Sequence, residues 1–164
     1  MMVPRRAREE GHKRKFLVVV DDTPECLIAL SYAARRAQNT GGGVLLLFVI
    51  EPEAPQGFAG VEEVMREEAR EQAQAALSKF AARARDVANL DTEMVIREGK
   101  PAEQVQHLIE ADEDIAVLVL AAGAGSEGPG PLVTAIAGRG SGSFPVPITI
   151  VPGTLTDEEI EAIA

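Results

Sequence analysis

The sequence predicts an α/β domain, in which helices cover both faces of a doubly wound, five-stranded parallel sheet. Short apolar segments alternate along the chain with segments whose apolar residues recur at helical spacing. Several of the short segments are apolar throughout, which is typical of strands buried on both faces. Glycines and prolines separate the segments, as expected at the ends of helices and strands. The 164 residues are enough for one such domain with a single core.

The strands are predicted from runs of β-branched and other apolar residues. The first two runs are continuously apolar, so we expect them in the middle of the sheet. The third run alternates polar and apolar residues, which indicates a strand near the edge. The predicted strands are residues 16–20, 44–50, 92–97, 115–121 and 146–151.

The first helix has a clear start and a clear end in the sequence. Asp22 or Thr23 is suited to cap it, and Pro24 to occupy its first position. The three glycines at 41–43 cannot continue a helix at low cost, so the helix is predicted to end there. The chain then enters the second strand.

A longer helix is predicted to begin at Val61, after a loop at residues 51–60 that contains two prolines and two glycines. Its apolar residues form one stripe, which is typical of a helix packed against a core. Shorter helices are expected after Pro101 and over residues 132–138. The stripe consists of Val64, Met65, Ala69, Ala73, Ala76, Leu77, Phe80, Ala84 and Val87.

The charge distribution divides the chain into three parts. Residues 1–15 carry six Lys or Arg and two Glu, a local charge of +4, whereas the whole chain carries −10 and the remainder therefore −14. We predict a flexible basic arm at residues 1–13, the domain at 14–152 and an acidic tail at 153–164. The tail begins at Thr156 like a capped helix.

Composition excludes several classes of function. A net charge of −10 disfavours binding to nucleic acid or to anionic lipid, and an aromatic content of 4% disfavours stacking on bases. The single cysteine, Cys26, permits no intramolecular disulfide. No apolar segment follows the charged N-terminus as in a signal peptide, and none is long enough to span a bilayer. We therefore expect a cytoplasmic protein without membrane or nucleic-acid partners.

A glycine-rich stretch at residues 123–130, here called the glycine loop, is the most informative motif. It follows the fourth strand and leads into a helix, so its backbone N–H groups could cradle a phosphate. In a doubly wound sheet, ligands bind beyond the carboxyl ends of the strands where the strand order reverses. Asp21 and Asp22 end the first strand, and we expect them at the same edge as the loop.

Two other interpretations of this edge fail on context. The glycine loop contains G-x-G-x-x-G, but nicotinamide-binding domains carry that motif after the first strand and need an acid about 20 residues later, which is missing here. Asp21 and Asp22 are similar to the acidic pair of a phosphoacceptor domain. However, the third strand ends in Arg97-Glu98 rather than in an acceptor aspartate, and no lysine ends the fifth strand.

A third interpretation rests on the order of five segments. They are LVVVDDTPE at 17–25, LLLFV at 45–49, GKPAE at 99–103, the strand at 115–121 with its glycine loop, and FPVPITIV at 144–151. Together they resemble the universal stress protein family over residues 14–152. The resemblance implies a Rossmann-like fold of the adenine-nucleotide alpha-hydrolase type. It also implies a homodimer formed through the last strand, residues 146–151, and a branch of the family that either does or does not bind ATP.

Members that bind ATP carry G-x2-G-x9-G followed by Ser or Thr. Gly125, Gly128 and Gly138 keep this spacing, and the resemblance places them, with Gly123, along the path of the phosphates. It likewise implies that the ribose or the phosphates lie near Asp21. It also implies that the backbone of Val49 would contact the adenine.

The chain departs from the family pattern in three ways. Arg139 replaces the hydroxyl residue after the last glycine, where a guanidinium could clamp phosphate or simply pair with a surface acid, and Ser141 supplies a hydroxyl nearby. Pro129 and Pro131 lack N–H groups in the loop. Asp22 stands in the place of the family's usual glycine and adds negative charge.

The sequence therefore predicts a stress-response protein with a cleft for ATP or AMP as a regulatory ligand, with Mg²⁺ at Asp21 and Asp22 accompanying ATP. The alternative is a dimeric interaction module of the same fold that binds no nucleotide. No enzyme is predicted, because His12 and His107 have no partner nearby in the sequence and no residues have the spacing of metal ligands.

Overall fold

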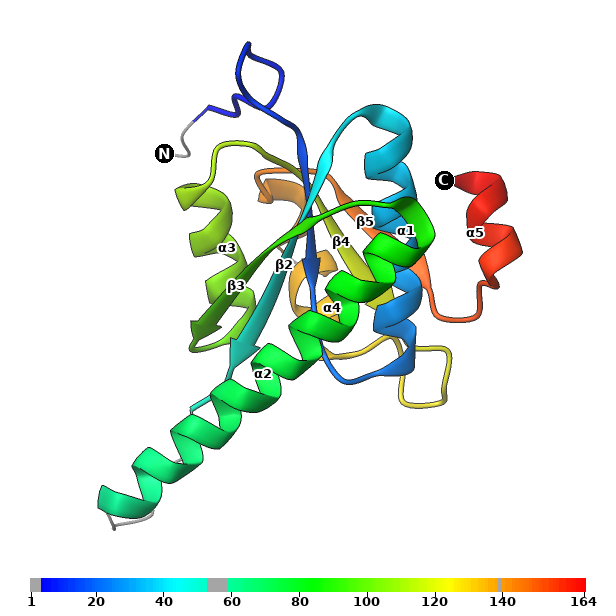
Figure 1. The fold of residues 1–164 in the computed structure, drawn as a ribbon. Coiled ribbons are helices and arrows are strands. Elements are labelled where there is room, and N and C mark those ends of the chain that lie inside the picture. The colour runs from blue at the N-terminus through cyan, green and yellow to red at the C-terminus, as the bar shows by residue number, and fades with distance from the viewer. Residues whose placement is uncertain (1–3, 53–58, 139) are drawn as a thin grey trace.

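The computed structural model describes residues 4–52, 59–138 and 140–164 (Figure 1). Its sheet has five parallel strands in the order β3-β2-β1-β4-β5, which confirms the predicted fold class. β1 lies in the middle, and the alternating strand β3 lies at an edge, as the sequence predicted. The strands are β1 (Lys15–Val19), β2 (Gly43–Ile50), β3 (Thr92–Glu98), β4 (Ile115–Ala122) and β5 (Ile148–Pro152).

Helices cover both faces of the sheet (Figure 1). α1 and α2 pack on one face, where Val18 and Leu46 belong to the core, and α3 and α4 pack on the other, where Leu17 and Leu45 do. Neighbouring residues of one strand thus serve opposite faces, which is why these strands are apolar throughout. The helices are α1 (Pro24–Thr40), α2 (Ala59–Ala88), α3 (Pro101–Ala111), α4 (Pro131–Ala137) and α5 (Asp157–Ile163), with a 3-10 turn at Ser141–Ser143.

The ends of α1 follow from local chemistry. Thr23, rather than Asp22, occupies the N-cap position with extended backbone, and Pro24 supplies a pre-set φ at the first turn. At the other end, Gly41 adopts a φ of 70° and its N–H bonds to the carbonyl of Ala37. A side chain at Gly41 would be strained in this left-handed conformation, so the helix ends at the predicted position.

α2 is longer than the sheet that it covers. Its C-terminal part carries Leu77 and Phe80, both buried in the core shared with α1 and the sheet. Its first turns extend past the carboxyl edge of the sheet (Figure 1), and Val64 is 54% exposed there. The apolar stripe predicted from the sequence is therefore exposed at Val64, where α2 has passed the edge of the sheet.

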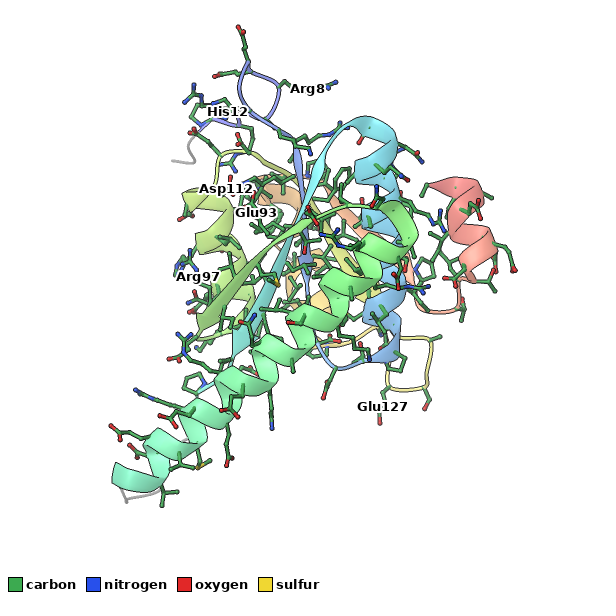
Figure 2. The ribbon with its side chains drawn as sticks, in the orientation of Figure 1. Arg8, His12, Glu93, Arg97, Asp112 and Glu127 are labelled. Carbon is green, nitrogen blue, oxygen red and sulfur yellow. The ribbon has the colours of Figure 1, made fainter. Side chains whose placement is uncertain are left out.

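The N-terminal segment, predicted to be a flexible arm, contacts the turn between α3 and β4. Arg5 Nη1 donates to the carbonyl oxygens of Ile109 and Asp112 at 2.7 and 3.0 Å. His12 Nδ1 lies 2.6 Å from Asp114 Oδ1, and Figure 2 shows His12 close to this end of α3. These partners are about a hundred residues away in the sequence, so no local pattern revealed them.

The C-terminal segment is packed rather than extended. Thr156 and Glu159 form the capping box of α5, as the sequence pattern indicated. Ile160 is completely buried, and Asp157 pairs with Arg83 of α2 at 2.9 Å. α5 lies against α1, so this acidic segment contributes to the folded core.

Candidate ligand-binding cleft

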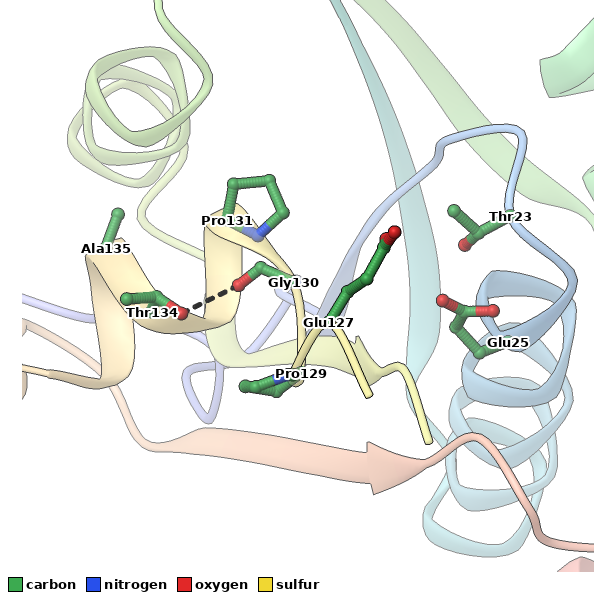
Figure 3. A pocket seen from close by; sticks show the side chains of 9 residues that line it. Thr23, Glu25, Glu127, Pro129, Gly130, Pro131, Thr134 and Ala135 are labelled. Carbon is green, nitrogen blue, oxygen red and sulfur yellow. Dashed lines mark hydrogen bonds between the residues drawn. The ribbon is translucent and has the colours of Figure 1, made fainter. Parts of the chain in front are cut away.

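The strand order reverses between β1 and β4, and a cleft of ≈ 660 Å³ lies beyond their carboxyl ends. One wall is the start of α1, and the other is formed by the glycine loop and α4 (Figure 3). This is the position at which open parallel sheets bind ligands. The lining residues are Thr23, Glu25, Glu127, Gly128, Pro129, Gly130, Pro131, Thr134 and Ala135.

The loop after β1 is held by Asp21. Its Oδ1 accepts hydrogen bonds from the backbone N–H of Thr23, at 2.8 Å, and from the Thr23 hydroxyl. This Asx turn brings Thr23 to the wall of the cleft. Asp21 and Asp22 are both exposed and lie next to the cleft, outside its described lining.

Cys26 holds the same loop through two further hydrogen bonds. Its buried Sγ donates to the carbonyl of Val19 at 3.1 Å and accepts the N–H of Asp21 at 3.4 Å. Burial, with a smaller effect of the negative charge of Asp21, raises the pKa of the thiol far above its ordinary value. Cys26 therefore stays protonated and has a structural role.

Two hydrogen bonds connect residues within the glycine loop. The N–H of Gly123 bonds to the carbonyl of Pro129 at 3.0 Å, and the N–H of Gly128 bonds to the carbonyl of Gly125 at 3.2 Å. Gly128 has a φ of 88°, a conformation that favours glycine. Pro129 and Pro131 have no N–H to offer. The sequence analysis predicted that the N–H groups of this loop would bind a ligand. Two of them, those of Gly123 and Gly128, bond to carbonyls inside the loop instead.

Two carboxylates face each other across the cleft. Glu25, in the first turn of α1, and Glu127, in the glycine loop, project from opposite walls (Figure 3). Glu25 Oε1 lies 3.1 Å from the position that a Cβ of Gly123 would occupy. A Cβ on Gly153 would lie 2.8 Å from the Cβ of Glu25, so glycine at this second position leaves room for the side chain.

Sequence reasoning did not select Glu25 or Glu127 as site residues. Its position in the first helical turn after β1 could have indicated Glu25. However, an acidic residue is common at that position because it stabilises the N-terminus of a helix. Only the tertiary structure places it against the glycine loop, about a hundred residues away in the chain.

The remaining predicted site residues lie outside the described lining of this cleft. Val49 is half-buried at the end of β2 and packs against the core under α3 and α4. Gly138 ends α4, where a Cβ would lie 2.7 Å from the carbonyl oxygen of Thr134, and Ser141 Oγ donates to the Gly138 carbonyl at 2.8 Å. Arg139 lies outside the described residues.

In the described part of the chain, no three His, Cys, Asp or Glu residues come together in a group that could hold a metal ion. No helix within residues 4–52, 59–138 and 140–164 has the length and apolar content needed to cross a membrane.

A sequence model of the universal stress protein family matches residues 13–152. The chain belongs to this family. The match includes all five strands and the whole cleft, and it ends before α5 of this universal stress protein. No curated protein sequence matches the chain significantly.

Solved structures of universal stress proteins share its fold. UspA from Lactobacillus plantarum is 15% identical with a TM-score of 0.65, covering 87% of this chain and 99% of its own. A family member from Arabidopsis thaliana, solved with AMP bound, is 19% identical with a TM-score of 0.60, covering 88% and 94%. One from Archaeoglobus fulgidus, in complex with dAMP, is 14% identical with a TM-score of 0.56, covering 84% and 96%. Because the sequence identities are this low, the structural comparison establishes only the fold of this universal stress protein.

Proposed function

We propose that this universal stress protein is a cytoplasmic regulatory protein of the stress response whose cleft binds an adenine nucleotide. The observation that carries the proposal is the cleft at the point of strand-order reversal, between the start of α1 and the glycine loop. Its volume of ≈ 660 Å³ is in the range of small-molecule sites. Relatives of the same fold have been solved with AMP and dAMP, which supports an adenine nucleotide as the ligand.

The residues at the cleft suit a nucleoside better than a chain of phosphates. Glu25 and the Thr23 hydroxyl of the lining, with Asp21 bonded to Thr23 beside it, can accept hydrogen bonds from ribose hydroxyls. A single phosphate would lie toward the glycine loop. Mg²⁺ enters the proposal only as a companion of ATP, because no group of three metal ligands occurs in the described residues.

The test is a thermal unfolding series with AMP, ATP, ATP plus Mg²⁺ and, as a control for the base, GMP. A ligand at 100 times its Kd should add about 2.7 kcal/mol of stability. For a domain of this size, each kcal/mol raises Tm by about 2–4 °C. We expect AMP to raise Tm and GMP to have a much smaller effect. Equal shifts with AMP and GMP, or none with any nucleotide, would contradict the proposal.

A second candidate function is a dimeric interaction module that binds no nucleotide. The observation that favours it is the glycine loop, in which the N–H groups of Gly123 and Gly128 bond to carbonyls of the loop itself. A dimer that persists without any response to adenine nucleotides would support this candidate.

We also propose that the protein forms a homodimer through β5. β5 is an edge strand, and Ile150 is 41% exposed on it. Ile150→Lys is expected to convert the dimer to a monomer, because it places two charges at a paired edge. Size-exclusion chromatography with light scattering measures the change. The matched control is Met94→Lys on the other edge strand, β3, where the side chain is 44% exposed and the dimer should persist.

A further inference from the structure

We propose that Glu25 makes the cleft select adenine nucleotides with a single phosphate over triphosphates, and that Glu127 strengthens this selection. The inference rests on the proposed function and concerns the ligand class of the same cleft. Three observations carry it: the place of Glu25 at the glycine loop, the bonding within that loop, and the charge of the described lining.

Glu25 lies at the N-terminal end of α1, the end of a helix that attracts anions. The first turn of a helix attracts negative charge, and the start of the 17-residue helix α1 forms one wall of the cleft. That turn carries its own carboxylate, whose Oε1 is 3.1 Å from the Cβ position of Gly123 at the base of the glycine loop. The side chain therefore occupies the space between α1 and the loop, and its charge opposes a second anion there.

Several groups of the glycine loop and of the start of α4 are not available to offset this repulsion. The N–H groups of Gly123 and Gly128 bond to carbonyls within the loop, and Pro129 and Pro131 have no N–H. The Thr134 hydroxyl donates to the carbonyl of Gly130 at 2.9 Å. These groups are therefore not free to donate to a chain of phosphates.

The charge of the described lining is negative. Its nine residues include Glu25 and Glu127 and no Lys or Arg. Each added phosphate brings at least one further negative charge to face these two carboxylates. Like charges a few Å apart in a partly desolvated cleft repel strongly, whereas salt weakens the repulsion when solvent is present. ATP is disfavoured relative to AMP for this reason.

Isothermal titration calorimetry of the full chain with AMP and with ATP, without Mg²⁺ and at low salt, tests the inference. We expect AMP to bind at least about tenfold more tightly than ATP, a difference of roughly 1.4 kcal/mol. Glu25→Gln should remove most of that preference by strengthening ATP binding, with AMP affinity changed less than about threefold. Raising the salt concentration should reduce the preference of the unmodified protein for AMP over ATP.

Three further variants separate charge from shape and from folding. Glu25→Asp keeps the charge and should keep the preference for AMP. Glu127→Gln should reduce the preference, by less than Glu25→Gln does. Glu110→Gln is the matched control, because Glu110 is exposed at the far end of α3 and should leave both affinities unchanged. The unfolding midpoint of each variant verifies that it is folded.

The outcomes distinguish this inference from the proposed function. If AMP binds but ATP binds equally well, or if Glu25→Gln leaves the ratio unchanged, the selection by Glu25 is overturned while nucleotide binding stands. If ATP binds only after Glu25→Gln, both proposals are supported. If no variant binds either nucleotide, the proposed function falls and this inference falls with it.

Discussion

Phe80→Ala is expected to lower the free energy of unfolding by about 3–5 kcal/mol. Phe80 is only 3% exposed and belongs to the core in which α1 and α2 pack on the sheet. Truncation would remove most of its apolar contacts and leave a cavity that the neighbouring strands can fill only in part. Urea denaturation followed by circular dichroism measures the change as a lower midpoint at an unchanged slope.

The matched control lies on the same helix. Val64 belongs to the apolar stripe that the sequence predicted, but it is 54% exposed in the part of α2 that extends past the sheet. Val64→Ala should therefore change stability by no more than about 0.5 kcal/mol. A large loss with this variant would mean that the first turns of α2 are buried in solution, for example against a second copy of the chain.

Ile160→Ala is expected to cost about 2–5 kcal/mol, the range for truncating a buried isoleucine. Ile160 is 0% exposed although it lies in α5, beyond the residues matched by the family. The loss would show in the urea midpoint, and hydrogen exchange would become faster first in α5, because this helix loses its main apolar anchor.

Ile163→Ala on the same helix provides the comparison, because Ile163 is 58% exposed and should contribute little. Equal and small effects of the two variants would show that α5 is attached loosely and does not share the core of the domain. The ion pair between Arg83 and Asp157 is exposed, so removing it should lower the free energy of unfolding much less than Ile160→Ala does.

Much of the fold was predictable because its signals are local. Strand and helix types follow from which residues are apolar and at what spacing, and the start and end of α1 follow from Pro24 and Gly41. The alternation of polar and apolar residues in β3 predicted its edge position. The capping box at Thr156 and Glu159 was visible as a pattern over four residues.

The site was predictable only in its location. The carboxyl ends of β1 and β4 must share an edge once the sheet is parallel, so Asp21 and the glycine loop were expected to lie near each other. The sequence did not reveal that the N–H groups of Gly123 and Gly128 bond within the loop, or that Glu25 projects toward it. Those facts depend on the path of the loop in space, which the order of its residues does not specify.

The sequence by itself determined the class of fold, the order of its elements and the edge of the sheet where the cleft lies. Tertiary structure alone decided that Val64 of the α2 stripe is exposed and that Ile160 is buried. It also decided that Arg5 and His12 contact the turn before β4, and that two glutamates face the cleft. The physical reason is the range of the interactions. Backbone propensity and apolar spacing act over a few residues, whereas burial and charge depend on neighbours brought together from distant parts of the chain.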